Sequence, residues 1–330
     1  MASGMTGGRR RVRAKVPATS ANLGPGFDAL GIALSLYAWI EMAPADETSI
    51  ALLGNGTEGL PADKSNLLYG IAQRVFDEAG VRVPELEIAF AGDIPLARGL
   101  GSSAAAIVGA LGAANALIGE PLPRDELFRI ATEIEGHPDN VGPAIYGGIV
   151  SAIWDGERAA HIRLEAPAAL ATLVAIPTYE LLTSKARAAL PETYSRADAV
   201  FNLSRAALLT AAFATGKLDV VRHAMQDRLH QPYRAPLVPG LSRVLSEASA
   251  HGALGAALSG AGPTAIAFVD ETSDRSRKTE LETFLREAMS ASGDGRDVEL
   301  RWLAPSAEGL VVEAASDRLQ DALAEGGLAR

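Results

Sequence analysis

The sequence predicts a two-domain protein of the α+β class. Its 330 residues exceed what one hydrophobic core usually serves, and 48% of them are hydrophobic, which suffices to fill two cores. Short segments with the pattern of strands occur in both halves of the chain, and helical segments with apolar residues three and four apart lie between them. These observations predict the class and the number of domains, whereas the topology does not follow from them.

The first domain is expected at residues 12–165. Its predicted strands lie at 12–16, 32–42, 48–53, 86–90, 149–153 and 161–164, and its predicted helices at 67–79, in the second half of 95–117, and at 121–136. The strand 12–16 is expected at a sheet edge, and a loop dense in Ser, Asn, Gly and Pro follows at 18–28. Asn66 precedes the helix 67–79 as a natural N-cap.

The second domain is expected at residues 166–330. Its predicted strands lie at 173–177, 255–258, 265–269, 298–303 and 310–313, and its predicted helices at 196–215, 219–230, 241–251, 275–289 and 318–323. Gly216, Pro232 and Gly252 follow three of these helices and are typical helix terminators. The glycine-rich turn 259–264 lies between two apolar strands and predicts a hairpin.

Charge and composition narrow the possible partners and the compartment. The net charge of −10 argues against nucleic acid or an anionic membrane, because a phosphate backbone attracts a basic face. The chain has no cysteine, which excludes disulfides and thiolate-bound metals, and its five histidines lack zinc spacing. The arginines near the N-terminus are followed by no apolar run, so they fit neither a Sec nor a twin-arginine signal. We therefore expect a cytoplasmic enzyme with a disordered tail at residues 1–11.

The stretch PLARGLGSSAAAIVGALGAANAL, residues 95–117, is the most informative. A flexible loop that leads directly into an uncharged helix leaves backbone N–H groups free at the positive end of the helix dipole, and this corner binds phosphate well. Gly99 and Gly101 let the backbone approach an anion, and Ser102 and Ser103 add hydroxyls. The candidate nucleotide-binding residues here are Pro95, Leu96, Ala97, Arg98, Gly99, Leu100, Gly101, Ser102, Ser103, Ala104 and Ala105.

Other interpretations of this stretch are weaker. A membrane-spanning helix would be richer in Leu, Ile, Val and Phe. The dinucleotide pattern G-x-G-x-x-A occurs three times in the chain, at residues 24–29, 99–104 and 260–265, and none directly follows an apolar strand as that site requires. A Walker A loop is excluded, since the Gly216-Lys217 pair lacks the upstream glycine. A glycine-rich turn without a ligand stays open.

Four segments together resemble the GHMP kinases, the superfamily of galactokinase, homoserine kinase, mevalonate kinase and phosphomevalonate kinase. Residues 95–104 match the pattern Pro-x-x-x-Gly-Leu-Gly-Ser-Ser-Ala. The segments VPATSANLGPGFDALGIAL (16–34), EGHPDNVGPAIYGG (135–148) and LSGAGPTAIAF (258–268) are similar to homoserine kinases in particular. The resemblance implies a ribosomal protein S5 domain 2-like N-terminal domain with a left-handed crossover, and a ferredoxin-like C-terminal domain.

The resemblance also implies a reaction and its participants. ATP with Mg²⁺ would phosphorylate the hydroxyl of L-homoserine in threonine biosynthesis, and relatives are often homodimers. The same pattern allows a kinase for another small alcohol, mevalonate-like or sugar, or a non-catalytic relative. An isoprenoid or sugar substrate has no ammonium and would leave Asp28 unpaired. Retention of Ser103, Glu133 and both loop glycines argues against a non-catalytic protein, which has no need of a metal site.

Residue roles follow only from the resemblance. Substrate would be bound by Asn22, Asp28, His137, Asn140, Arg187 and Arg234, with Asp28 on the ammonium and the two arginines on the carboxylate. Without the family, each of these would be read as a loop or surface residue. Ser103 and Glu133 are the expected Mg²⁺ ligands, with Glu135 also possible. Asn66 and Leu67 are candidates for adenine contact, although capping is the simpler role for Asn66.

The attacking hydroxyl has no obvious base in this sequence. Mevalonate-kinase-type relatives carry an Asp where this chain has Asn140, which cannot accept the proton. We expect the proton to pass to phosphate or solvent, with Asp139 as an outside candidate. Pro138 and Pro143 suggest that His137, Asp139 and Asn140 lie on a loop before a short helix.

Overall fold

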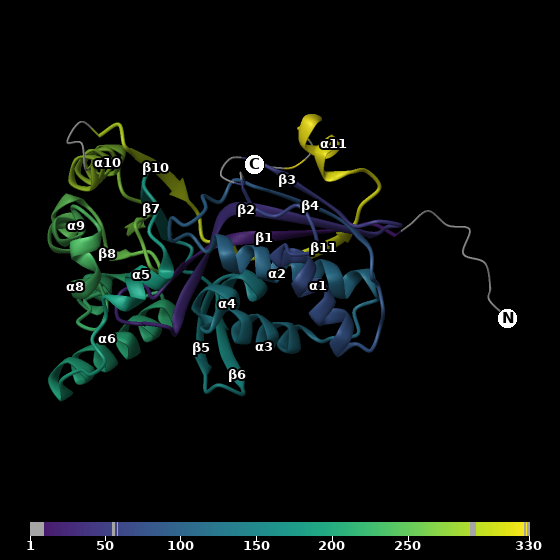
Figure 1. Cartoon of the computed structure of the whole chain (residues 1–330). Helices are drawn as coiled ribbons and strands as arrows, with labels where there is room; N and C mark the ends of the chain where they lie inside the picture. The colour runs from purple at the N-terminus through teal and green to yellow at the C-terminus, as the bar shows by residue number, and fades with distance from the viewer. Residues whose placement is uncertain (1–9, 55–56, 58, 291–294, 327, 329–330) are drawn as a thin grey trace.

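The computed structural model describes residues 10–54, 57, 59–290, 295–326 and 328, and it contains two lobes built on separate sheets (Figure 1). The first sheet has seven strands in the order β11-β1-β2-β4-β3, with β5 and β6 attached through β2. Its strands are β1 (Val12–Ala21), β2 (Leu30–Pro44), β3 (Ser49–Leu53), β4 (Leu86–Gly92), β5 (Ile149–Trp154), β6 (Ala159–Leu164) and β11 (Val311–Ala314). The β3–β4 pair is parallel and the other pairs are antiparallel.

Helices cover one face of this sheet (Figure 1). They are α1 (Leu67–Glu78), α2 (Ser102–Leu117), α3 (Arg124–Glu135) and α4 (Pro138–Tyr146). Nearly every residue of α2 from Ala104 onward is buried, which confirms the prediction of a central apolar helix. Its small residues are needed for this packing: a Cβ on Gly109 would lie 2.1 Å from Ile40 Cδ1.

The second sheet has four antiparallel strands in the order β10-β7-β9-β8. They are β7 (Leu170–Pro177), β8 (Gly255–Leu258), β9 (Ala265–Asp270) and β10 (Val298–Leu303), so the predicted hairpin at 255–269 is confirmed. The helices of this part are α5 (Thr183–Ala188), α6 (Arg196–Thr215), α7 (Val221–Ala224), α8 (Gln231–Arg234), α9 (Leu241–Glu247) and α10 (Arg275–Met289). Apolar side chains of α9 and α10 share a core with the sheet. The two units confirm the α+β prediction.

The end of the chain returns to the first sheet and corrects two predictions. Residues 12–16 are not an edge strand, because β11 pairs with β1 on the side away from β2. The segment 166–330 is therefore not a domain by itself, since β11 and the helix α11 (Leu319–Ala324) belong with the first lobe. Residues 18–21, predicted as loop, continue β1.

The N-terminal tail is described only in part. Residues 1–9 of the predicted tail lie outside the described residues. Arg11 is held by side-chain bonds to Glu41 and Glu87, each 2.7 Å long. Arg11, which the prediction assigned to the tail, therefore has defined contacts with the first lobe.

The predicted helix at 219–230 is broken. The structure has a 3-10 helix at Leu218–Val220, then α7, and leaves helical conformation after Ala224. The carboxylate of Asp227 accepts hydrogen bonds from three backbone N–H groups, those of Leu229, His230 and Gln231. A short polar side chain that takes these N–H groups replaces the helical carbonyls, which is why the periodic pattern here does not give one helix.

Within the described part of the chain, no helix is both long and apolar enough to cross a bilayer.

Candidate active site

The carbonyl groups of the loop before α2 are hydrogen-bonded to neighbouring parts of the protein. Four consecutive carbonyl oxygens each accept a hydrogen bond from a donor outside the loop. The pairs are Ala97 with the Leu181 N–H (3.2 Å), Arg98 with the Thr264 N–H (3.3 Å), Gly99 with the Ser259 hydroxyl (2.6 Å) and Leu100 with the Thr19 N–H (3.1 Å). Left-handed backbone recurs at alternate positions, Ala97, Gly99 and Gly101, with φ of 51°, 79° and 71°. Such alternation turns successive N–H groups toward one side, where an anion can be bound.

Protein contacts require both loop glycines. A Cβ on Gly99 would lie 2.4 Å from the carbonyl oxygen of Ser259, and one on Gly101 would lie 1.9 Å from Thr19 Oγ1. The sequence predicts these glycines as places for an anion to approach. The structure adds that β1 and the glycine-rich turn of the other lobe pack so closely against the loop that no side chain fits at either position.

A cavity of ≈ 220 Å³ opens beside this loop and gathers most of the predicted site. The predicted residues that line it are Asn22, Asp28, Ala97, Gly99, Gly101, Ser102, Ser103, His137, Asn140, Arg187 and Arg234. Residues from both lobes contribute, because the glycine-rich turn at 260–262 forms one wall. Side chains of opposite charge therefore meet next to the loop before α2.

Some predicted residues lie outside the lining. These are Pro95, Leu96, Arg98, Leu100, Ala104, Ala105, Asn66 and Glu133. Leu100, Ala104 and Ala105 are fully buried, so their side chains support the loop from the core. Arg98 instead faces Glu180 at 3.5 Å. The side chain of Asn66 caps α1 by accepting from the Leu68 N–H, while Leu67 is exposed.

Two glutamates at the end of α3 differ in what they contact. The hydroxyl of Ser103 donates to Glu135 at 3.0 Å, whereas Glu133 pairs with Arg129 and Arg74 at 3.0 and 3.3 Å. Residues two apart on a helix lie on different faces, so only one of the two can turn toward α2. The structure thus places Glu133, the preferred Mg²⁺ ligand from sequence, away from Ser103, and it places Glu135 beside it.

The residues present fit a magnesium ion. Hydroxyl and carboxylate oxygens are the hard ligands that Mg²⁺ prefers. Burial raises the pKa of Glu135, and the charge of His137 and the Ser103 bond offset this only in part. A half-buried carboxylate of this kind is stabilised by a cation next to it.

Asp28 and Arg187 form a bidentate ion pair in the cavity. The two guanidinium nitrogens lie 2.9 and 3.0 Å from the two carboxylate oxygens. Asn22 holds the loop that carries Asp28, because its Oδ1 accepts from the Asp28 N–H and its Nδ2 donates to the Gly260 carbonyl. Asn22 and Asp28 both have positive φ, 69° and 55°, so the loop is held in a conformation that few residues adopt.

Arg234 is held more firmly than Arg187. It is 2% exposed and donates to the carbonyl oxygens of Ala186 and Gly260 at 3.3 and 3.1 Å. Burial, followed by the charge of Arg187, lowers the pKa of Arg234. Arg234 also lines the cavity. The two backbone acceptors hold its guanidinium group in place there.

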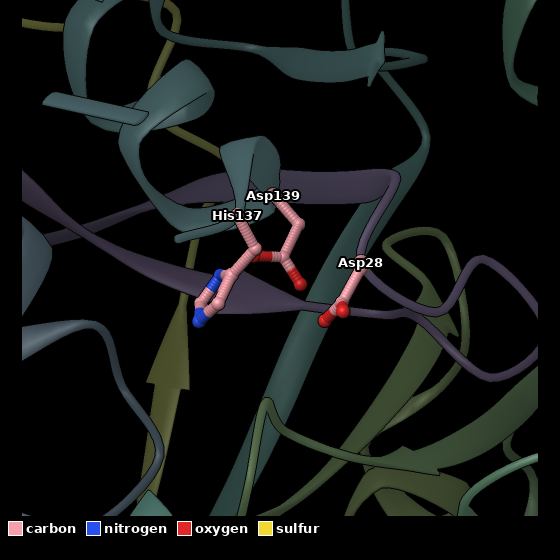
Figure 2. A group of neighbouring side chains, drawn as sticks. All are labelled: Asp28, His137 and Asp139. Atoms are coloured by element: carbon pink, nitrogen blue, oxygen red, sulfur yellow. The ribbon is translucent and has the colours of Figure 1, made fainter. Parts of the chain in front are cut away.

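His137, Asp139 and Asn140 lie at the start of α4, which corrects the predicted loop. Pro138 occupies the first turn of the helix, and His137 precedes it in extended conformation. Figure 2 shows His137 and Asp139 on this turn with Asp28 approaching from the loop after β1, the two carboxylates turned toward each other. Atoms of these three side chains lie within 4.8 Å of one another.

The charges in this cluster are set by Asp139. Burial opposes a charge on the imidazole, but the hydrogen bond and the negative charge of Asp139 outweigh it, so the pKa of His137 is raised. Asn140 accepts from the Thr19 hydroxyl at 2.7 Å and lies next to Gly101. An amide therefore lies beside the loop before α2, close to an imidazole whose pKa is raised.

Sequence reasoning gave no role to Thr19, whose N–H donates to the carbonyl oxygen of Leu100 in the phosphate loop. Ser259 and Gly260 belong to the glycine-rich turn 259–264, which the family resemblance implies to support the phosphate loop and the substrate pocket. The structure shows their contacts: Ser259 donates to the Gly99 carbonyl oxygen, and the Gly260 carbonyl oxygen accepts from Asn22 and Arg234. Thr183 lines the cavity four residues before Arg187. Their roles depend on which strands and turns pack together.

Comparison with known proteins gives consistent matches along the chain. The family model described as GHMP kinases N terminal domain matches residues 66–148, and that described as GHMP kinases C terminal matches residues 209–291. A homoserine kinase of Deinococcus radiodurans is 47% identical over 289 residues, covering 88% of this chain and 93% of that protein. A homoserine kinase of Carboxydothermus hydrogenoformans is 47% identical over 277 residues, covering 84% and 90%.

Solved structures agree with these matches. The crystal structure of a homoserine kinase from Cytophaga hutchinsonii has a TM-score of 0.81 at 26% identity, covering 94% of this chain and 100% of that chain. A mevalonate kinase of Methanococcus jannaschii has a TM-score of 0.64 at 16% identity, covering 89% and 98%, and shows the shared fold.

Proposed function

The chain belongs to the GHMP kinase family, and from this premise we propose that it transfers a phosphoryl group from ATP to the hydroxyl of L-homoserine in threonine biosynthesis. The product is O-phospho-L-homoserine. The observation that carries the proposal is a cavity in which the loop before α2 meets the carboxylate of Asp28 and the guanidinium groups of Arg187 and Arg234, with Glu135 and Asp139 also in its lining. Such a site fits an anionic nucleotide and a zwitterionic alcohol at the same time.

The nucleotide end is formed by the loop from residue 95 to Ser103. N–H groups at the start of α2 would bind the phosphates of ATP, and Arg98 adds a positive charge nearby. Ser103 and Glu135 would hold Mg²⁺, which neutralises charge on the phosphates when bound. This assignment differs from the sequence-based preference for Glu133, which the two arginines already neutralise. Leu67, exposed at the start of α1, is the better of the two candidates for adenine contact.

The amino-acid end is formed by three charged side chains. Asp28 would bind the ammonium group, and Arg187 with Arg234 would bind the carboxylate, which suits the planar guanidinium fork. Asn22 would act by holding Asp28 in place. Every full charge on the substrate then has a partner, as a partly desolvated site demands.

The transfer step needs alignment more than covalent chemistry. His137, with its raised pKa, would place a positive charge beside the transferring group. Asn140 would hydrogen-bond the attacking hydroxyl but cannot accept its proton, so the proton passes to phosphate or solvent. Asp139 is engaged by His137, which makes it a poor competitor for that role.

The test is a steady-state assay with L-homoserine and MgATP in which ADP release is coupled to a dye. Turnover with L-homoserine and none with mevalonate or galactose would support the assignment. Turnover with mevalonate alone would overturn it, and a protein that does not bind MgATP by calorimetry would be a non-catalytic relative.

Replacing Asn140 by Asp is expected to lower kcat by about tenfold or more, because a further carboxylate beside Asp139 would repel the phosphates. The measurement is the pH profile of kcat from pH 6 to 9. Asn140→Ser is the control, because it removes the amide without adding charge. An Asn140→Asp enzyme that is several-fold faster, with a pH dependence set by the new carboxylate, would show that a base at this position helps the reaction.

Replacing Gly101 by Ala is expected to weaken nucleotide binding and also to destabilise the fold by about 1–3 kcal/mol, since it forces an L-residue into left-handed backbone. Gly240→Ala is a matched control, because that glycine has φ +82° and its added Cβ would lie 1.7 Å from the Ala288 carbonyl oxygen, away from the cavity. Thermal melts should show a loss of stability in both variants, while calorimetry with MgATP should show lost affinity only for Gly101→Ala. Equal nucleotide affinity in the two variants would contradict the role of the loop.

A further inference from the structure

The ring of Phe27 lies under the two arginines of the cavity without lining the cavity itself. It is half-buried in the loop after β1, directly before Asp28. The guanidinium carbon of Arg187 is 5.6 Å from its ring centroid and that of Arg234 is 5.3 Å. One aromatic ring therefore contacts both cations that we assign to the substrate carboxylate.

These two cations oppose each other. The charge of Arg187 contributes to the lowered pKa of Arg234, after burial. Asp28 neutralises Arg187, while Arg234 is 2% exposed and its described side-chain hydrogen bonds go to neutral groups. The negative face of an aromatic ring attracts a cation within about 6 Å of its centroid. The charges of Asp28, Asp139 and Asp227 act in the other direction and raise the pKa of Arg234, and the ring of Phe27 adds to this attraction through its face.

The ring of Phe27 also stacks on the imidazole of His230, the residue directly before α8. His230 stacks on Phe27 at 5.2 Å with an interplanar angle of 24°. Its Nε2 lies 2.7 Å from the Gly24 carbonyl oxygen, and its Nδ1 lies 3.3 Å from Arg234 NH1. Because arginine can only donate, Nδ1 accepts and Nε2 donates, which is the neutral tautomer. Burial lowers the pKa of His230, in agreement with this assignment.

We infer that Phe27 is a positioning residue: its ring holds Arg187 and Arg234 in the spacing that binds the substrate carboxylate. This inference rests on the proposed function of the cavity. Phe27 contributes to affinity for the amino acid and leaves the phosphate loop unaffected, because the described contacts of its ring are to the two arginines and to His230, none of which belongs to that loop.

The test compares Phe27→Leu with Phe27→Tyr, since the first removes the aromatic face and the second keeps it. Phe27→Leu should raise the KM for L-homoserine about 5- to 30-fold, the effect of about 1–2 kcal/mol at 1.4 kcal/mol per tenfold. Its KM for MgATP should stay within about twofold, because the loop contacts are unchanged. Phe27→Tyr should restore most of the affinity for L-homoserine. If Phe27→Leu does not fold, Phe27→Met, which also lacks a ring, replaces it.

The chain offers a matched control in Phe201 of α6. Its ring also contacts two guanidinium groups, those of Arg205 at 3.2 Å and Arg228 at 3.9 Å, and it does not line the cavity. Phe201→Leu should leave both KM values unchanged. A Phe27→Leu enzyme with an unchanged KM for L-homoserine, or with both KM values raised equally, would overturn the inference, as would a failure of Phe27→Tyr to restore affinity.

Calorimetry with L-homoserine separates this inference from the proposed function. A wild-type protein that binds L-homoserine but does not phosphorylate it would contradict the kinase assignment. The difference in affinity between Phe27→Leu and Phe27→Tyr would still decide the role of Phe27.

Discussion

Glu135→Gln is expected to lower kcat by about 100-fold or more, whereas Glu133→Gln should stay within about threefold of the wild type, because a lost metal ligand removes several kcal/mol of charge stabilisation and a surface ion pair contributes little. The two residues form a matched pair. They are the same amino acid, two positions apart at the end of α3, and differ in that only Glu135 reaches Ser103. Neither of the two arginines that pair with Glu133, Arg74 and Arg129, is among the residues that line the cavity.

The measurement is kcat as a function of Mg²⁺ concentration at saturating ATP and L-homoserine. Glu135→Gln should need more Mg²⁺, and its deficit should shrink as Mg²⁺ is raised. The metal binds the ionised carboxylate, and burial raises the pKa of Glu135. At limiting Mg²⁺, wild-type activity should therefore decline as the pH falls through this raised pKa, at a higher pH than for an ordinary glutamate, and Glu135→Gln should lose this dependence. A larger deficit in Glu133→Gln would return the metal site to the sequence-based assignment.

The choice between Glu133 and Glu135 shows which parts of the site could be predicted from the sequence and which could not. The phosphate loop was predictable, because its glycines, serines and following helix are contiguous and carry their own physical signature. The ligand from α3 was not, since it depends on which face of that helix turns toward α2. That orientation is set by packing among helices and leaves no mark in the spacing of Glu133 and Glu135.

The differences in the fold have a similar cause. The position of β1 inside the sheet depends on β11, which is some 300 residues away in sequence and pairs with Val12–Lys15. The early end of α7 depends on Asp227, whose carboxylate binds three N–H groups, and local periodicity does not show this. Asp139 and Asn140 belong to α4 because Pro138 starts that helix, although Pro143 looked like the better starting point. Short-range patterns thus predicted the elements, while contacts distant in sequence decided their ends and neighbours.

Replacing Asp28 by Asn is expected to raise the KM for L-homoserine by about 10- to 100-fold, since the ammonium loses a charged partner worth about 1.5–3 kcal/mol. The pair that Asp28 forms with Arg187 adds a second, less obvious expectation. A zwitterion can exchange this pair for two new ones, with its ammonium on Asp28 and its carboxylate on Arg187. A substrate that has a carboxylate but no ammonium would pair with Arg187 in place of Asp28, and Asp28 would then have no cationic partner.

The analogue that tests this is 4-hydroxybutanoate, which has the hydroxyl and the carboxylate of homoserine and no amino group. The wild type should prefer L-homoserine in kcat/KM by about 100-fold or more, because the analogue leaves the half-buried carboxylate of Asp28 without a cation. Asp28→Asn should reduce that preference to about tenfold or less, by weakening L-homoserine while leaving 4-hydroxybutanoate unchanged or improved. Asp198→Asn is the control, because Asp198 also pairs with an arginine, Arg228, but lies outside the cavity lining. If Asp28→Asn weakened both substrates equally, Asp28 would stabilise the loop rather than discriminate between ligands, and the specificity for an amino acid would have to come from elsewhere in the site.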